Sequence, residues 1–187
     1  MSIADLVKEK AHKVLGIDAS TNSFAFCLMH NDKPVKWGEV NFEGADVYER
    51  LHDAKVKIRS FKRHLDYDFI AIEAAVSVKS VQTGLKMAYV FGTIMGELMN
   101  NEIKVVEIHP ITWQSYIGNK NFTKAEKDAV KKEFPGKSES WIKGKIRERR
   151  KDKTINFART LGVETDSDNV ADSVGIAWYA INEVVRK

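Results

Sequence analysis

The chain of 187 residues has little cysteine, no long apolar run and no internal repeat. Cys27 is the only cysteine, which excludes an intramolecular disulfide and is typical of a reducing compartment, so we expect a cytoplasmic protein. No stretch of about eighteen apolar residues occurs, which excludes a membrane-spanning helix. Residues 1–10 mix acids and bases, so we expect an amphipathic lead-in and no signal peptide. Residues 1–187 are therefore predicted to form one globular domain.

Charge is distributed unevenly along the chain, whose net charge is +4. Residues 118–160 contain 14 Lys and Arg and six Asp and Glu, so this segment carries +8 and the remainder carries −4. Such a segment is either a solvated helical surface or a surface for phosphates, and the charge run alone favours neither. An acidic site beside it favours the second, because the bases hold phosphates while the acids hold a metal ion.

Five short apolar segments predict a five-stranded mixed sheet: 14–17, 24–29, 35–42, 69–72 and 102–108. Tight turns separate the first three, which indicates an antiparallel meander. A helical stretch follows 43–46, so the fourth strand is expected to run parallel to its neighbour. Further helices are predicted at 80–100, at 110–116, from Lys124, over 139–160 as one helix or a pair, and at about 169–185.

The predicted helix 80–100 is apolar on more than one face. One face would cover the sheet, and the other is suited to a second subunit. We therefore expect a homodimer.

Four acidic residues stand where a strand ends or the last helix begins. Asp18 and Glu73 each end an apolar strand, and Asp168 and Asp172 open the apolar C-terminal segment. A carboxylate at the end of a buried strand is costly unless a cation meets it. Oxygen ligands of this kind suit hard divalent metals such as Mg²⁺. The four residues together therefore predict a shared metal site.

Taken singly, most of these acids also have a structural explanation. Asp18 is a candidate turn or helix-capping residue, and Asp168 is a candidate N-cap of the last helix. Glu73 has no such explanation, because Glu is a poor strand residue and a poor cap. The ordered placement of all four along one chain favours the metal site.

Four motifs together resemble the RuvC-type Holliday junction resolvases of the ribonuclease-H-like superfamily, particularly their viral and phage relatives. The motifs are Leu15-Gly16-Ile17-Asp18-Ala19-Ser20, Ala71-Ile72-Glu73, Thr83-Gly84-Leu85-Lys86, and Asp-Asn-Val-Ala-Asp-Ser-Val-Gly-Ile-Ala at 168–177. The resemblance spans residues 14–180. It implies a ribonuclease-H-like α/β fold with a basic helical insertion at about 118–160. It also implies a dimer that binds a four-way DNA junction and cuts two strands symmetrically, which for a viral or phage protein would take place in the host cell.

The same resemblance implies that Asp18, Glu73, Asp168 and Asp172 bind two Mg²⁺ or Mn²⁺ ions, with Asp18 bridging them. Such a pair activates water on one side and stabilises the leaving 3′ oxygen on the other. The family usually spaces its last two ligands three residues apart, and here that position holds Asn169. Positions three and four residues apart share a helix face, so Asp168 is the expected ligand and Asn169 its substitute.

Basic residues also depart from the family pattern. Trp113 and Gln114 stand after the fifth strand, where relatives often have Lys. Lys124 matches a second basic position and is expected to hold the scissile phosphate, whereas His109 is more typical of a structural residue. Expected DNA contacts are Lys120, Lys124, Lys127, Lys143, Lys145, Arg147, Arg149 and Arg150.

The resemblance therefore implies a Mg²⁺-dependent endonuclease that resolves four-way junctions. Two alternatives remain open. A ribonuclease H acting on RNA–DNA hybrids would share the acidic set without needing a dimer. A non-catalytic protein that binds branched DNA would be favoured by Asn169 in the ligand register.

Overall fold

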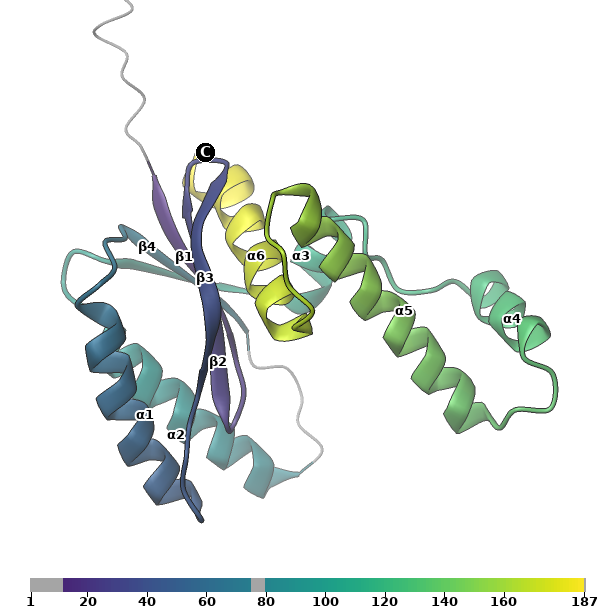
Figure 1. Ribbon diagram of the computed structural model, residues 1–187, viewed down its shortest axis with the longest axis horizontal. Helices are drawn as coiled ribbons and strands as arrows, with labels where there is room; N and C mark the ends of the chain where they lie inside the picture. Colours follow the sequence, from purple (N-terminus) through teal and green to yellow (C-terminus); the bar gives the residue numbers. More distant parts are fainter. Residues whose placement is uncertain (1–11, 75–79, 187) are drawn as a thin grey trace, which may run out of the picture.

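The central feature of the molecule is a five-stranded sheet with the order β3-β2-β1-β4-β5 (Figure 1). The structure is a computed structural model and describes residues 12–74 and 80–186. The strands are β1 (Lys13–Ala19), β2 (Ser23–His30), β3 (Lys33–Asn41), β4 (Phe69–Glu73) and β5 (Lys104–Ile108). β1, β2 and β3 are antiparallel neighbours, whereas β4 pairs in parallel with both β1 and β5. The predicted meander followed by two parallel strands is confirmed.

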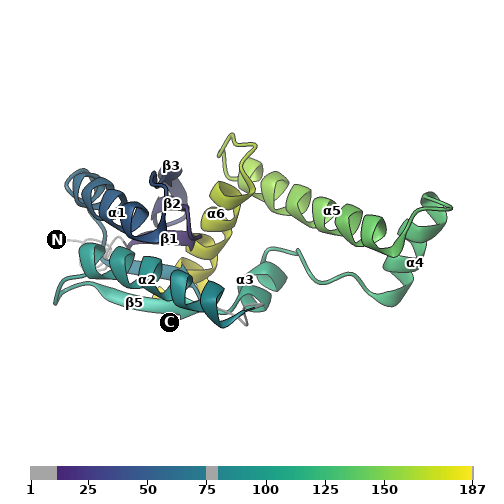
Figure 2. The same cartoon turned by 90° about the horizontal axis from the view of Figure 1, so that it is seen from below.

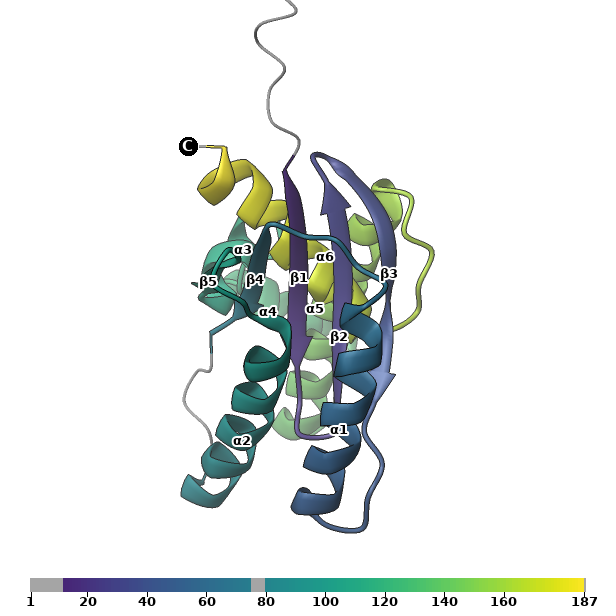
Figure 3. The same cartoon turned by 90° about the vertical axis from the view of Figure 1, so that its left-hand side faces the viewer.

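Helices cover both faces of this sheet, as Figures 2 and 3 show from two sides. α1 (Val47–Lys62) and α2 (Val81–Leu98) lie on one face, and α6 (Asp168–Ala180) lies on the other. α6 continues as a π-helical turn, η2 (Ile181–Val185). Because side chains alternate along a strand, Leu15 and Ile17 pack towards α1 and α2 while Val14 packs towards α6.

The helix boundaries follow from capping residues. Asp46 accepts hydrogen bonds from two backbone amides at the start of α1, and Ser80 caps α2. Pro110 begins α3 (Pro110–Tyr116), and Thr123 forms a capping box with Glu126 at the start of α4 (Lys124–Glu133). Side-chain oxygens at these positions satisfy amides that have no partner within the helix.

α4 and α5 (Glu139–Thr160) form an arm that projects from the sheet domain (Figures 1 and 2). The C-terminal half of α5 packs on α6, where Ala158 is fully buried, and α4 packs on the N-terminal half around Val130 and Ile142. The predicted basic segment 118–160 thus corresponds to this arm, and its second half is a single helix.

Two glycines allow α6 to approach its neighbours closely. A Cβ atom on Gly16 would lie 2.4 Å from the backbone oxygen of Ser173 and 2.6 Å from Cβ of Ala177. A Cβ atom on Gly175 would lie 2.6 Å from the Trp113 ring of α3. Close packing of this kind fixes the position of α6 over β1 and under α3.

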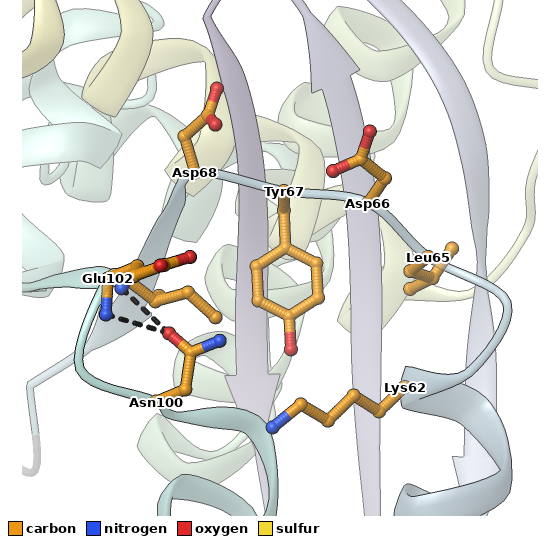
Figure 4. A pocket seen from close by; sticks show the side chains of 8 residues that line it. Lys62, Leu65, Asp66, Tyr67, Asp68, Asn100 and Glu102 are labelled. Carbon is orange, nitrogen blue, oxygen red and sulfur yellow. Dashed lines mark hydrogen bonds between the residues drawn. The ribbon is translucent and has the colours of Figure 1, made fainter.

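A hollow of about 280 Å³ lies where β4 and β5 begin, at the opposite end of these strands from Glu73 (Figure 4). Its polar groups bind the surrounding backbone. The Tyr67 hydroxyl donates to the Leu98 carbonyl at 2.9 Å, and Lys62 Nζ donates to the carbonyls of Glu97 and Met99. Oδ1 of Asn100 accepts from the amide of Glu102 at 2.9 Å. This hollow is a structural junction between α1, α2 and the sheet.

The predicted strands and helices are confirmed, with ends shifted by one or two residues. Cys27 is buried in β2 as a free thiol, as expected of a core residue. Across the described ranges, no helix combines the length and apolar character needed to cross a bilayer. The predicted N-terminal lead-in, 1–10, lies outside the described residues.

Candidate active site

Strand register brings two of the predicted acids to one edge of the sheet. Ile17 of β1 pairs with Ile72 of β4, so the next residues, Asp18 and Glu73, lie side by side where the two parallel strands end. Both are on the face covered by α6, since they alternate with Ile17 and Ile72 in the opposite core. Asp18 is paired with Ala25 inside the sheet, which excludes its alternative role as a turn or cap.

The N-terminal end of α6 supplies the other two acids. Ser167 is the N-cap and accepts from the Val170 amide at 3.3 Å, so Asp168 is the first helical residue. The alternative in which Asp168 caps the helix is therefore wrong. Asp172 lies one turn further along, next to Ser173, whose backbone closely approaches Gly16 of β1. The packing of α6 on Gly16 thus carries Asp172 towards Asp18.

The electrostatics of these acids indicate that they share one region. Burial raises the pKa of Asp18 to about 7, with further contributions from Glu73, Asp168 and Glu39. Burial also raises the pKa of Asp172 to about 8, with contributions from Asp18, Glu73 and Asp168, opposed by Lys151. Desolvation and like charge both disfavour the ionised form. A bound cation would relieve both effects.

Glu73 is held by a residue whose role the sequence did not reveal. Nε1 of Trp113, a fully buried side chain in α3, donates to Oε2 of Glu73 at 2.8 Å. Burial raises the pKa of Glu73, whereas this hydrogen bond and the nearby His109 lower it. His109 itself caps α3 by accepting from the Ile111 amide at 3.3 Å, which confirms its structural role.

A fifth acid, Glu39 of β3, fastens the start of α6 to the sheet. Its carboxylate accepts from Ser23 Oγ at 2.8 Å, from Asn169 Nδ2 at 2.9 Å and from Ser167 Oγ at 3.1 Å. Asn169, the expected substitute ligand, therefore uses its amide nitrogen to anchor the helix. Glu39 lies opposite Ala25, which in turn lies opposite Asp18. No motif in the sequence singles it out.

A cleft of about 340 Å³ opens between these acids and α5. Asp18, Asp168 and Asp172 line one side, and Arg147, Arg150 and Lys151 of α5 line the other. Lys151 forms an ion pair with Asp168. Glu73 does not line the cleft and lies beside Asp18 against Trp113.

Gln114, which stands where relatives often have Lys, takes part in the same cleft. Nη2 of Arg150 donates to Oε1 of Gln114 at 2.6 Å, and Arg150 also contacts the buried Asn119. Positive charge therefore reaches this side of the cleft from α5 through Arg150.

The remaining predicted basic residues lie along the arm. Lys124 begins α4 and does not line the cleft, so Lys151 is the lysine beside the acids. Lys145 pairs with Glu148, and Arg149 pairs with Glu133. Lys120, Lys127 and Lys143 are exposed.

The donor set fits a hard divalent cation, because it consists of half-buried carboxylates that offer oxygen ligands. In the part of the chain that the structure describes, however, no three His, Cys, Asp or Glu side chains converge closely enough to hold a metal ion as they stand. Asp168 forms an ion pair with Lys151, and Glu73 accepts a hydrogen bond from Trp113. Metal binding would thus require the acidic side chains to move closer together.

Comparison with known proteins gives structural neighbours only. No protein-family model and no curated protein sequence matches the chain. T. thermophilus RuvC in complex with a Holliday junction substrate has a TM-score of 0.65 at 12% identity, covering 90% of this chain and 94% of that chain. Another structure of Thermus thermophilus RuvC has a TM-score of 0.63 at 12% identity, with 90% and 95% covered. The yeast mitochondrial Holliday junction resolvase Ydc2 has a TM-score of 0.50 at 14% identity, with 91% and 79% covered.

At these identities the similarity establishes the fold. The chain has the ribonuclease-H-like fold of the RuvC structures, as predicted. The nearer resemblance to viral and phage relatives stays a prediction.

Proposed function

We propose that the protein is a structure-selective endonuclease that resolves four-way DNA junctions. The observation that carries this proposal is the cleft in which Asp18, Asp168 and Asp172 face Arg147, Arg150 and Lys151. Carboxylates suit a catalytic metal, and cations opposite them suit a phosphodiester. The fold that carries this cleft is that of RuvC, which has been solved with a Holliday junction.

In this proposal Asp18, Glu73, Asp168 and Asp172 hold two Mg²⁺ or Mn²⁺ ions. When bound, such ions supply an activated water and charge stabilisation at the leaving oxygen. Trp113 holds one oxygen of Glu73 and leaves the other free to coordinate. Hydrolysis breaks the bond between phosphorus and the 3′ oxygen, so the products carry a 5′ phosphate and a 3′ hydroxyl.

Lys151 is the residue that we assign to the scissile phosphate. Its ammonium group is paired with Asp168. If Asp168 held a metal ion in place of this partner, the Lys151 ammonium would remain in the lining of the cleft, within which it would bind an oxygen of the phosphate. Lys124, the sequence-based candidate, would have to reach the cleft from the start of α4.

We further propose that the active form is a homodimer, because two cuts at one junction require two sites. The outer face of α2 supports this proposal. Val81, Leu85 and Tyr89 recur every four residues and are 80%, 50% and 45% exposed. Exposed apolar residues gathered on one helix face are typical of a subunit interface. We call these three residues the α2 face.

Two other functions are separable by substrate. A ribonuclease H would cut RNA–DNA hybrids, and a non-catalytic protein would bind junctions without cutting them. Asn169 is engaged by Glu39, whereas Asp168, four residues before Asp172, lines the cleft with a carboxylate. A carboxylate in this place favours the catalytic proposal over the second alternative.

The test is to incubate purified protein with a labelled four-way junction, linear duplex and RNA–DNA hybrid, in Mg²⁺, Mn²⁺ or EDTA. We expect paired, symmetric, metal-dependent nicks confined to the junction. Cutting of the hybrid alone would assign a ribonuclease H, and junction binding without cleavage in either metal would assign a binding protein. Asp18→Asn should abolish cleavage and leave junction binding nearly intact, because phosphate contacts dominate affinity.

A further inference from the structure

The face of α5 that lines the cleft continues outwards along the arm. Arg147, Arg150 and Lys151 line the cleft, and Lys143 lies four residues before Arg147. Residues at such spacings share one side of a helix. We call Lys143, Arg147, Arg150 and Lys151 the basic row. At a rise of 1.5 Å per residue it extends for about 12 Å along α5.

Cations on the other sides of α5 are used within the arm. Arg149 donates to both oxygens of Glu133 at 2.6 Å and lies over the Phe134 ring. Lys145 donates to Glu148 at 2.7 Å. Among the residues that the structure describes, neither Lys143 nor Arg147 has a carboxylate within ion-pair distance. The outer half of the basic row is therefore open to an external anion.

Three acidic residues of α5 lie close to the basic row. Glu148 and Asp152 directly follow Arg147 and Lys151, so each is turned by about 100° around the helix axis. Glu139 stands at the first position of α5, near the tip of the arm, where it pairs with Lys131 of α4. Glu139 shares the side of Lys143 but has Lys131 as its partner, so positive charge predominates along the row.

The arm holds this row on a supported helix. At the tip, Phe134 packs against Trp141 with ring centroids 4.9 Å apart, and Val130 and Ile142 are buried between α4 and α5. At the base, Nδ2 of Asn119 donates to the Arg150 carbonyl and to Thr154, each at 2.9 Å. A row of cations on a supported helix keeps a fixed spacing.

We propose that the basic row binds the phosphate backbone of the DNA arm that leaves the cleft along α5. This inference rests on the proposed function, since it assigns a path to the same substrate. One strand of B-DNA carries a phosphate about every 3.4 Å along the axis, so a row of about 12 Å can follow several successive phosphates. Figure 2 shows α5 leading from the start of α6 away from the sheet. The row makes the DNA beyond the cut site part of the binding surface.

The test compares two double variants that each remove two positive charges from the arm. Lys143→Gln with Arg147→Gln removes the open half of the basic row. Lys132→Gln with Lys137→Gln is the control. Lys132 lies two residues after the buried Val130 and so faces away from α5, and Lys137 lies over the Trp141 ring at the tip of the arm. Circular dichroism establishes that both variants keep the helices of the wild type.

Binding to a labelled four-way junction and to linear duplex is measured in EDTA over a series of salt concentrations. Each lost phosphate contact lowers the slope of log K against log salt by about 0.9. We expect the slope of the row variant to fall by roughly 1.8 and that of the control to stay at the wild-type value. Equal slopes in all three proteins, or equal losses in both variants, would overturn the inference.

The same data separate this inference from the proposed function. If the wild type binds duplex and junction equally and only the row variant loses slope, the row holds DNA but junction selectivity fails. If the wild type binds the junction selectively and the row variant keeps the full slope, only the basic row fails. If the wild type binds neither DNA, both proposals are wrong.

Discussion

At the scale of single residues, the acids Asp18 and Asp172 lower the stability of the metal-free protein when they ionise. Each is a carboxylate whose pKa is raised mainly by burial, to about 7 and about 8. An acid that stays protonated in the folded state binds a proton that the unfolded chain releases near pH 4. Its contribution to stability is therefore complete at low pH and is lost as the pH rises towards the folded-state pKa.

Asp172→Asn is expected to stabilise the metal-free protein at pH 8 and to abolish cleavage. The amide cannot ionise, so the variant avoids the cost of a buried charge. That cost is on the order of 2 kcal/mol once solvent relaxation is allowed for. Melting temperatures in EDTA at pH 4, 5, 6, 7 and 8 measure the effect, which should be small at about pH 4 and grow with pH. A stabilisation that is the same at every pH would show that charge is not its cause.

Trp113→Phe is expected to weaken metal binding while the fold is kept. Phenylalanine fills most of the buried space beside Gly175 but cannot donate to Oε2 of Glu73. Since that hydrogen bond lowers the pKa of Glu73, its loss disfavours the ionised form that binds a cation. A hydrogen bond to a charged group contributes about 1.5–3 kcal/mol, so the Kd for Mn²⁺ should rise by roughly tenfold or more.

Calorimetric titration of Mn²⁺ into the DNA-free protein measures this affinity directly. Trp178→Phe is the matched control, because Trp178 of α6 packs near Phe157 of α5, whereas the hydrogen bond to Glu73 comes from Trp113. Equal Mn²⁺ affinity in the two variants would mean that Trp113 serves packing alone.

The sequence identified the acids of the candidate site better than the residues that position them. Asp18, Glu73 and Asp172 interrupt apolar segments, and such an interruption can be recognised in the sequence alone. Glu39 is an acid in a polar, half-exposed strand, where an alternating pattern is normal. Lys151 is one of many cations in the arm, and only the packing of α5 on α6 selects it.

At the scale of helices and strands, capping residues in the sequence predicted where helices begin. They did not predict which side of a helix contacts its neighbours. Pro110 and Thr123 begin helices as their chemistry predicts, and Ser138 caps α5. The side of α5 that faces the cleft depends on which residues α4 and α6 cover. That information is long-range, so spacing within α5 alone does not supply it.

Gly16→Ala tests the approach of α6 to β1. The added Cβ atom would lie 2.4 Å from a backbone oxygen, so α6 must move outwards. Overpacking of this kind costs about 1–3 kcal/mol, which lowers the urea midpoint at an unchanged m-value. Cleavage should fall as well, because Asp172 moves with α6.

Gly144→Ala in α5 is the matched control for that substitution. A Cβ atom at Gly144 meets nothing within 4 Å. Alanine in an exposed helix interior is more stable than glycine by about 0.5–1 kcal/mol. If both variants shift the midpoint in the same direction, close packing at Gly16 is not the cause.

At the scale of the whole molecule, the two most distinctive surfaces lie on opposite faces of the sheet. α6 and the arm lie on one side of the sheet, and α2 lies on the other (Figures 2 and 3). The cleft is lined by residues of α5 and α6, and the α2 face is formed by exposed side chains of α2. Tyr48 of α1, which is 70% exposed, lies with Tyr89 beside a shallow hollow. A two-fold pairing of α2 faces would leave both clefts open to the same branched DNA.

If the proposed homodimer forms through the α2 face, Leu85→Glu is expected to yield a monomer and to replace paired cuts by single nicks. A charge in an apolar interface loses solvation without gaining a partner, and in a two-fold pair it meets its own copy. Sedimentation measures the assembly, and a junction in a supercoiled plasmid separates products with one cut from those with two.

Val56→Glu is the control, because Val56 is 56% exposed on α1, two residues beyond the buried Ala54 and so on the opposite side of that helix. A Leu85→Glu protein that stays dimeric would place the interface elsewhere. A monomeric wild type that still makes paired cuts would remove the reason for a dimer.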